Sequence, residues 1–306
     1  RNKNLFISSE RYEFVWSLYE NGILKRQGKF RARVGPQEEK AVPLPVEKKQ
    51  WEELDGEILF DCEARLSEPQ LWADEGAPAA FGQSILRDKK MRAEYRQPAV
   101  LLKGDFNIGI KMRDCRAILS KADGRLISIS KDGREYMEDS IRPDFWRAPT
   151  DNDGGNGNTE RWAQWKLASL YQRCEEITVD VENGWISTKF RLSTTPVTYC
   201  YVNYQCSYDN RIDITVQLEQ NEALEMPCMG WVCRLKKEFD HLRWYGNCQQ
   251  EAYLDRRSGK RLGITEGVVA EQYVPYLNPQ ENGNKTDLRY FIVKTEDGRG
   301  LKVSGE

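Results

Sequence analysis

Alternation of apolar and polar residues is the strongest pattern in this chain. Residues 12–18 read YEFVWSL and residues 212–218 read IDITVQL, with an apolar side chain at every second position. A period of two residues predicts strands that bury one face. Turn pairs punctuate the chain, among them Asn21-Gly22 and Asp132-Gly133, and such pairs favour tight hairpins. The chain is therefore predicted to be all-β, a sandwich or barrel of short strands.

One segment has helical spacing instead. Trp162, Trp165 and Ala168 recur every three residues, and Thr159 stands where a helix N-cap is expected. These positions predict one short helix inserted between strands. The preceding residues 151–160, DNDGGNGNTE, predict a polar, glycine-rich loop of high backbone freedom. Loops of that kind are mobile and often functional.

A charged stretch divides the chain. Residues 87–98, RDKKMRAEYRQP, show no apolar periodicity and end in Pro98. We therefore expect a linker at 87–102, a first domain at 1–86 and a second domain at 103–306. Two domains also suit a chain of 306 residues.

Charge and hydrophobicity exclude two classes of partner. The chain carries 46 basic and 48 acidic residues, interspersed, for a net charge of −2. That balance predicts no binding to nucleic acid or to an anionic membrane surface. No apolar run approaches the roughly 20 residues that a membrane-spanning helix needs, so we expect no membrane partner.

Motifs for metal binding and nucleophilic catalysis are missing. The single histidine, His241, excludes a three-histidine zinc site, and a serine triad would need a G-x-S-x-G elbow that the sequence lacks. Residues 151–162 begin like a calcium loop, but Gly155 and Trp162 occupy its fifth and twelfth positions. We therefore predict no metal site in the chain. The eight cysteines form no C-x-x-C pair and are expected to be free thiols, which favours a reducing, cytoplasmic location.

A second unusual stretch spans residues 273–290. It combines aromatic side chains and two prolines with amides and carboxylates, the polar members being Gln280, Glu281, Asn282, Asn284 and Asp287. Amides and carboxylates beside aromatic rings suit a surface of sugar hydroxyls. The same groups equally suit a turn-rich connection whose side chains bond to their own backbone. The residues alone leave both interpretations open.

Several motifs carry a resemblance to a known family. Residues 145–153 read FWRAPTDND, residues 244–256 read WYGNCQQEAYLDR, and residues 273–289 read YVPYLNPQENGNKTDLR. Their order and spacing resemble the final domain of family 2 β-galactosidases. Residues 1–6 and the stretch 71–83 resemble the immunoglobulin-like domain that follows the catalytic barrel in that family. The resemblance covers nearly the whole chain.

The resemblance implies a fold and an activity. Residues 1–86 would form an immunoglobulin-like β-sandwich, expected to lack its first strand. Residues 103–306 would form a galactose-mutarotase-like antiparallel supersandwich, expected to be truncated at its C-terminus. The family hydrolyses terminal non-reducing β-D-galactose residues of β-galactosides such as lactose, with two glutamates on a (β/α)₈ barrel. The barrel also holds Mg²⁺ and Na⁺ or K⁺. Because it is absent here, we expect no catalytic residue and no cofactor in this chain.

The resemblance also implies partners and a site. The chain would brace its own catalytic barrel and N-terminal domains, meet the β-galactoside substrate in the full-length enzyme, and take part in a homo-oligomer. In the family, the loop after the DND motif lies near the active-site mouth and can move. The candidate substrate-proximal residues are Asp151, Asn152, Asp153, Gly154, Glu281 and Asn282.

The sequence departs from the family motifs at several positions. Cys248 replaces a glycine, Gln249 a proline and Ala252 an asparagine. Cys228, after Pro227, stands where the family has an arginine, which removes a buried ion pair or hydrogen bonds. We expect these departures to change individual contacts and to leave the fold intact.

Two other functions compete with this interpretation. A stand-alone carbohydrate-binding or structural module would bind sugar without a barrel. A mutarotase-like epimerase would need a histidine acid and a glutamate base in one pocket, and His241 lies outside any match to such a site. Activity that appears only when the chain is joined to a barrel separates the first interpretation from both.

Overall fold

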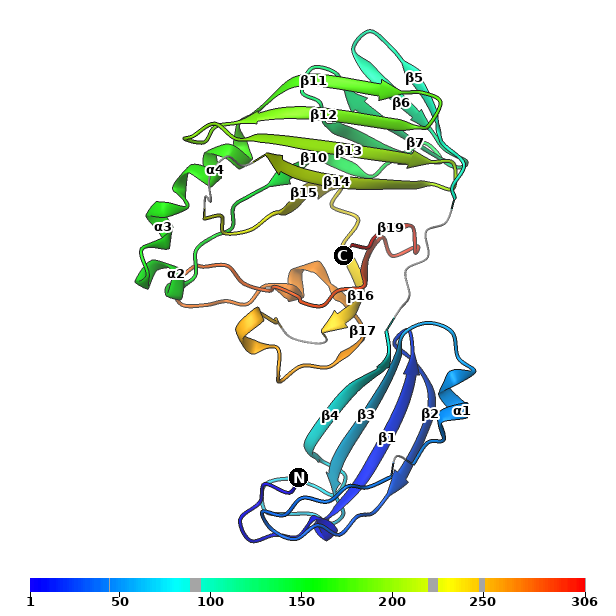
Figure 1. Cartoon of the computed structure of the whole chain (residues 1–306), viewed down its shortest axis with the longest axis vertical. Coiled ribbons are helices and arrows are strands. Elements are labelled where there is room, and N and C mark those ends of the chain that lie inside the picture. The colour runs from blue at the N-terminus through cyan, green and yellow to red at the C-terminus, as the bar shows by residue number, and fades with distance from the viewer. Residues whose placement is uncertain (44, 89–94, 220–224, 248–250, 306) are drawn as a thin grey trace.

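Antiparallel sheets account for most of the chain (Figure 1). The structure, a computed structural model, describes residues 1–43, 45–88, 95–219, 225–247 and 251–305. Over those ranges the strands form four sheets, and their pairings are antiparallel. The prediction of an all-β fold is confirmed.

The first sheet lies in the N-terminal domain and has the strand order β2-β1-β3-β4. Its strands follow a 3-10 turn, η1 (Ser9–Arg11), and are β1 (Tyr12–Glu20), β2 (Ile23–Phe30), β3 (Ile58–Leu66) and β4 (Pro78–Arg87). On one face Trp16, Leu18 and Phe60 pack against Val46, which leads into the short helix α1 (Lys48–Glu52). Burial of these apolar side chains holds the segment that contains α1 against the sheet.

The predicted Asn21-Gly22 turn joins β1 to β2. Asn21 and Gly22 have φ angles of 49° and 79°, and positive values at both residues define the hairpin turn that matches strand twist. A Cβ atom on Gly22 would lie 2.9 Å from side-chain atoms of Ile264 and Tyr245 in the second domain. The turn is confirmed, and its glycine also permits the two domains to approach closely.

Two sheets of the second domain stack as a sandwich (Figure 1). One sheet has the order β15-β10-β8-β7-β6-β5 with β9 beside β8, and the other has the order β11-β12-β13-β14. Ile108 and Leu119 from the first and Phe190 and Val202 from the second lie in one buried core. The first sheet comprises β5 (Val100–Lys103), β6 (Asn107–Lys111), β7 (Cys115–Ser120), β8 (Leu126–Lys131), β9 (Arg134–Glu135), β10 (Met137–Asp144) and β15 (Gly230–Leu235). The second comprises β11 (Gln172–Asp180), β12 (Trp185–Leu192), β13 (Tyr199–Ser207) and β14 (Arg211–Glu219).

The segment between the last strand of the first domain and the first strand of the second is shorter than the predicted linker, 87–102. β4 runs to Arg87, and β5 begins at Val100. Ala99 and Leu101 are buried in the sandwich core, and Ala99 N donates to Cys206 O at 2.9 Å. Apolar burial therefore recruits the end of the predicted linker into a strand. Residues 89–94, its centre, lie outside the described residues.

The predicted helix is the last of three short helices that bend around one end of the sandwich (Figure 1), namely α2 (Asp151–Gly155), α3 (Asn158–Arg161) and α4 (Ala163–Leu170). Trp165 and Ala168 are fully buried, as their helical spacing predicts. Thr159 lies inside α3, so the prediction that it caps the helix is wrong. The prediction of a loop throughout residues 151–160 is also wrong, because Thr150 caps α2 within that segment.

A further sheet of the second domain lies between the sandwich and the first domain (Figure 1). Its order is β17-β16-β18-β19. The strands are β16 (His241–Asn247), β17 (Leu262–Val268), β18 (Tyr290–Lys294) and β19 (Gly300–Val303), with 3-10 turns η2 (Leu254–Arg256) and η3 (Val269–Gln272) between them. Gln83 of β4 bonds to both backbone groups of Leu262, at 2.9 and 2.7 Å. Among the described residues, no helix has the length and apolar character needed to span a bilayer.

Candidate functional site

An ion pair holds the DND segment in place. Arg147 donates two hydrogen bonds to the Asp153 carboxylate, at 2.6 and 3.2 Å. The backbone N and the hydroxyl of Thr150 donate to the same carboxylate at 2.7 and 2.9 Å. The Arg147 guanidinium, with help from Thr150, lowers the pKa of Asp153 to about 2. Arg147 also lies 5.4 Å from the Trp162 ring centroid. The Asp153 carboxylate therefore stabilises the N-terminus of α2, and its hydrogen bonds leave it closed to a ligand.

Hydrogen bonds tie α2 to the proline-rich segment. Asp151 N donates to Gln280 Oε1 at 3.2 Å, and Asn278 Nδ2 donates to Asp151 Oδ1 at 2.7 Å. The two segments that the sequence marked as unusual, 151–160 and 273–290, therefore form one site. Both bonds are exposed, so they position α2 without burying it.

Glu281 lies half-buried beside the ion pair. Burial raises the pKa of its carboxyl, while Arg147 and the backbone N–H of Ala148 oppose that rise. Burial likewise raises the pKa of the neighbouring Cys228 thiol to about 11. A neutral thiol thus stands beside the carboxyls of Glu281 and Asp144. The family resemblance led us to expect an arginine here, and Cys228 offers these carboxyls no positive charge.

Two asparagines of the proline-rich segment serve the backbone. Asn282 Oδ1 accepts from Val274 N, and Asn282 Nδ2 donates to Gln280 O, both at 3.1 Å. Asn284 Nδ2 donates to Ala252 O at 2.8 Å, and Ala252 N donates to Asn284 O at 2.7 Å. For Asn282 and Asn284 the structure therefore favours the interpretation of a turn-rich connection.

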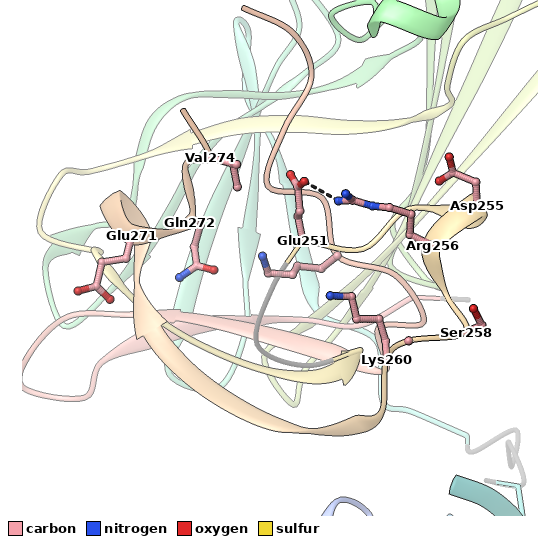
Figure 2. Close-up of a pocket in the computed structure, with 10 residues that line it drawn as sticks. Glu251, Asp255, Arg256, Ser258, Lys260, Glu271, Gln272 and Val274 are labelled. Atoms are coloured by element: carbon pink, nitrogen blue, oxygen red, sulfur yellow. Dashed lines mark hydrogen bonds and ion pairs between the residues drawn. The ribbon is translucent and has the colours of Figure 1, made fainter. Parts of the chain in front are cut away.

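Glu251 anchors the wall of a neighbouring cleft (Figure 2). It accepts hydrogen bonds from Arg256 Nη2 at 2.5 Å, from Gly283 N at 3.1 Å and from the Tyr276 hydroxyl. Burial alone would raise the pKa of Glu251, but these three donors lower it below its usual range. The cleft has a volume of about 650 Å³. Glu251 is thus an ionised structural group that fixes the cleft's shape.

The predicted substrate-proximal residues fall into two groups. Asp153 and Asn282 are engaged inside the protein, and Glu281 is half-buried against Arg147. The other three are exposed on α2 and keep surface that a ligand can reach: Asp151, Asn152 and Gly154.

Sequence reasoning named Gln280 among the polar groups of its stretch, but it did not single out Arg147 or Asn278 as members of the site. The spacing Thr150-x-x-Asp153 is close to that of a capping box and was the available signal for α2. No local sequence pattern predicts the contact between Asp151 and Asn278, because 127 positions separate them.

The remaining departures from the family motifs differ in their surroundings. Ala252 is fully buried, so its small side chain suits the space. Cys248 and Gln249 lie outside the described residues. The seven described cysteines are free thiols.

A second network of ion pairs and hydrogen bonds joins the second domain to the first domain. Glu57, which is 1% exposed, accepts hydrogen bonds from Arg289 Nε at 3.0 Å and from the Tyr245 hydroxyl. Arg261 also reaches Glu63 of β3, and Asp61 lies 3.9 Å away. The two domains are therefore joined by charged contacts as well as by the packing at Gly22.

The chemistry of the site is hydrogen bonding. Exposed carboxylate and amide groups on α2 can meet a hydroxyl-rich ligand. Within the part of the chain that the structure describes, no three His, Cys, Asp or Glu side chains are grouped so as to hold a metal ion.

Comparison with known sequences defines the class. Residues 111–305 match the family described as "Beta galactosidase small chain", and residues 1–87 match "Beta-galactosidase, domain 4". Both descriptions are of domains of a glycosidase. The chain belongs to the beta galactosidase small chain family.

Curated relatives agree with this assignment. A beta-galactosidase of Priestia megaterium is 33% identical over 310 residues, which cover 100% of this chain and 30% of the relative. One of Clostridium acetobutylicum is 31% identical over 88% of this chain and 30% of its own length. One of Streptococcus thermophilus is 30% identical over a match that covers 99% of this chain and 30% of the relative. The chain thus spans about 30% of the length of these relatives.

Proposed function

We propose that this chain is the non-catalytic C-terminal region of a β-galactosidase that hydrolyses terminal non-reducing β-D-galactose residues of β-galactosides such as lactose. The observation that carries the proposal is the match of both domains to β-galactosidase domains, over about 30% of the length of the relatives. Retaining glycosidases need two carboxylates about 5 Å apart. In this proposal both belong to a catalytic barrel outside the chain, together with Mg²⁺ and Na⁺ or K⁺.

The chain's own role is to brace the barrel and to present α2 at the mouth of the active site. Two features support that role. The charged contacts of Glu57 and Arg261 hold the two domains together, so that both can support the barrel as one unit. The ion pair between Arg147 and Asp153 holds α2 with its exposed polar face outward. The enzyme is proposed to be a cytoplasmic homo-oligomer.

A chimera tests the proposed activity. The chain would replace the corresponding region of the Priestia megaterium relative, and hydrolysis of nitrophenyl β-galactoside and β-glucoside would be compared. We expect hydrolysis of the galactoside at a rate within about tenfold of the intact relative, and little of the glucoside. A soluble chimera that is inactive on both would contradict the proposal.

The contribution of α2 is tested in the same chimera. Removing the exposed carboxylate with Asp151→Ala should raise KM for the galactoside, because α2 loses its bond from Asn278. The matched control is Asp209→Ala, an exposed carboxylate elsewhere in the domain. Equal KM values for the two variants would exclude α2 from the active-site mouth.

A further inference from the structure

Four large apolar side chains are exposed at one end of the first domain, each of them at least 68% exposed. They are Leu5, Phe6, Leu71 and Trp72. Ser67 joins the two segments that carry them, because its backbone N and its hydroxyl donate to Arg11 O at 3.1 and 2.8 Å. Single exposed apolar side chains are ordinary on a protein surface, whereas several at one place mark an interaction site. We call these four residues the distal surface.

Strand pairing places the distal surface away from the second domain. β1 and β3 run antiparallel, and Tyr12 pairs with Leu66 at one end of the sheet. The other end carries Gly22 and Glu57, which meet the second domain. β1 has nine residues, and a strand rises ~3.4 Å per residue, so the two ends lie about 30 Å apart. The segments before Tyr12 and after Leu66 therefore emerge together at the end that the second domain does not reach (Figure 1).

Leu71 and Trp72 occupy the centre of a tight turn. Gln70 pairs with Ala73 on either side of them, and Gln70 N donates to Ala73 O at 2.8 Å. The centre of a turn usually holds Gly, Asn, Asp, Pro or Ser, which suit its backbone and its exposure to water. Turn geometry therefore gives no reason for a leucine and a tryptophan here. Contact with a partner does give one, because tryptophan is enriched among the residues that carry binding energy.

Leu5 and Phe6 lie on a bend whose backbone is held on both sides. The buried Asn2 makes these bonds, since its Nδ2 donates to Ile7 O at 2.7 Å and its Oδ1 accepts from Asn4 N at 3.0 Å. A side chain on an ordered backbone loses less conformational freedom when it binds. The distal surface is thus preorganised for a partner.

We propose that the distal surface docks into an apolar pocket on the catalytic barrel of the parent enzyme. The proposal rests on the proposed function, in which the chain is the C-terminal region and the barrel precedes it. The chain spans about 30% of the length of its curated relatives, so most of such an enzyme is available to cover this surface. Residue 1 lies at the same end of the first domain (Figure 1). The covalent joint therefore holds the barrel beside the distal surface at high effective concentration, an advantage that a second copy of the chain would not have.

Hydroxyl-radical footprinting with mass spectrometry tests the docking. The full chain alone is compared with the chimera that carries the Priestia megaterium barrel. Phe6 and Trp72 should each react about fivefold or more slowly in the chimera, because the core of an interface excludes water. The matched control is Phe106 of the second domain, which is 86% exposed against 89% for Phe6 and should react equally in both proteins.

Two results would overturn the proposal. One is equal reactivity of Phe6 and Trp72 in the chain and in the chimera. The other is protection in the chain alone that increases with protein concentration, which would assign the surface to a second copy.

Variants of the chimera show which side chains hold the contact. Trp72→Ser should return the reactivity of Phe6 toward its value in the chain alone, whereas Phe106→Ser should leave Phe6 protected. Both variants should leave the thermal unfolding of the chain alone unchanged, because the side chains that they remove are exposed. If Phe6 stays equally protected in both variants, Trp72 takes no part in the contact and the proposal fails.

The hydrolysis assay keeps this result separate from the proposed function. An active chimera in which Phe6 and Trp72 stay reactive would refute the docking alone. A chimera that protects both residues but hydrolyses no galactoside would support the docking and contradict the proposed activity.

Discussion

Glu57 and Arg289 lie 232 positions apart and form a buried ion pair between the two domains, with Arg289 Nε 3.0 Å from Glu57 Oε1. Glu57 precedes β3 in the first domain, and Arg289 precedes β18 in the second. The Tyr245 hydroxyl donates to the same carboxylate, and burial, together with this bond, raises the pKa of Tyr245. The contact joins the domains through groups that are costly to leave unpaired.

Breaking this pair should be expensive. Glu57→Gln leaves the half-buried Arg289 without its counter-charge, and we expect a loss of about 3 kcal/mol in the free energy of unfolding. The control is Glu52→Gln, which removes an exposed pair with Lys48 at 3.1 Å and should cost no more than about 0.5 kcal/mol. Urea denaturation of both variants measures the difference. Equal losses would show that the buried pair does not stabilise the fold.

The Gly22 turn gives a test of packing between the domains. Gly22→Ala forces a Cβ atom to within 2.9 Å of Ile264 and Tyr245, in addition to the strain of a φ angle of 79°. Gly133→Ala is the control. It carries the same backbone strain, since φ at Gly133 is 77°, but it causes no clash, because no atom lies within 4 Å of the new Cβ. We expect Gly22→Ala to be less stable than Gly133→Ala by at least about 1 kcal/mol, measured by thermal unfolding.

The pKa of Asp153 predicts a dependence of stability on pH. Its folded value of about 2 lies below the ordinary 3.8, so the pair with Arg147 stabilises the fold above about pH 4 and loses that effect as pH falls toward 2. Asp153→Asn should cost roughly 2 kcal/mol at pH 7, and the cost should shrink progressively below pH 4. Asp151→Asn, an exposed control, should cost much less at pH 7. A cost for Asp153→Asn that is the same at pH 7 and pH 3 would contradict the assignment.

Glu281 should behave in the opposite sense. Its folded pKa is raised above 4.5, so its charged form is penalised and destabilises the fold as pH rises above that value. Glu281→Gln should therefore stabilise the chain slightly at pH 7, by less than about 1 kcal/mol since the group is half-exposed, and have no such effect below pH 4. Glu160→Gln, on the exposed face of α3, is the control and should show no change of sign with pH. Denaturation curves at pH 7 and pH 3.5 give the free energy of unfolding of both variants. An effect of Glu281→Gln that is the same at the two pH values would contradict the prediction.

Local patterns predicted the parts of the fold that depend on neighbouring residues. The Asn21-Gly22 hairpin and the buried face of α4 followed from the sequence, because turn geometry and helical spacing are set over a few residues. Helix α2 lies where we predicted a loop, because that prediction rested on Gly154 and Gly155 and did not consider the capping signal of Thr150 and Asp153. The glycines lower helix propensity, but the contact of Asp153 with Arg147 offsets that cost.

Contacts between distant segments were beyond sequence reasoning. The motifs containing Asp151 and Gln280 were each singled out, yet nothing in a single sequence shows that they touch. Glu57 lies in no motif, and the motif that contains Arg289 does not show that the two residues pair. Such contacts depend on how the sheets pack, which no local period encodes.

Hydrolysis of a chromogenic β-galactoside is the most direct test of the central claim. The chain would be assayed alone and again after mixing with the separately expressed N-terminal and barrel portion of the enzyme. The account predicts no hydrolysis by the chain alone and activity on mixing. Hydrolysis by the purified chain alone would contradict it, because that result would require a catalytic pair of carboxylates within these two domains.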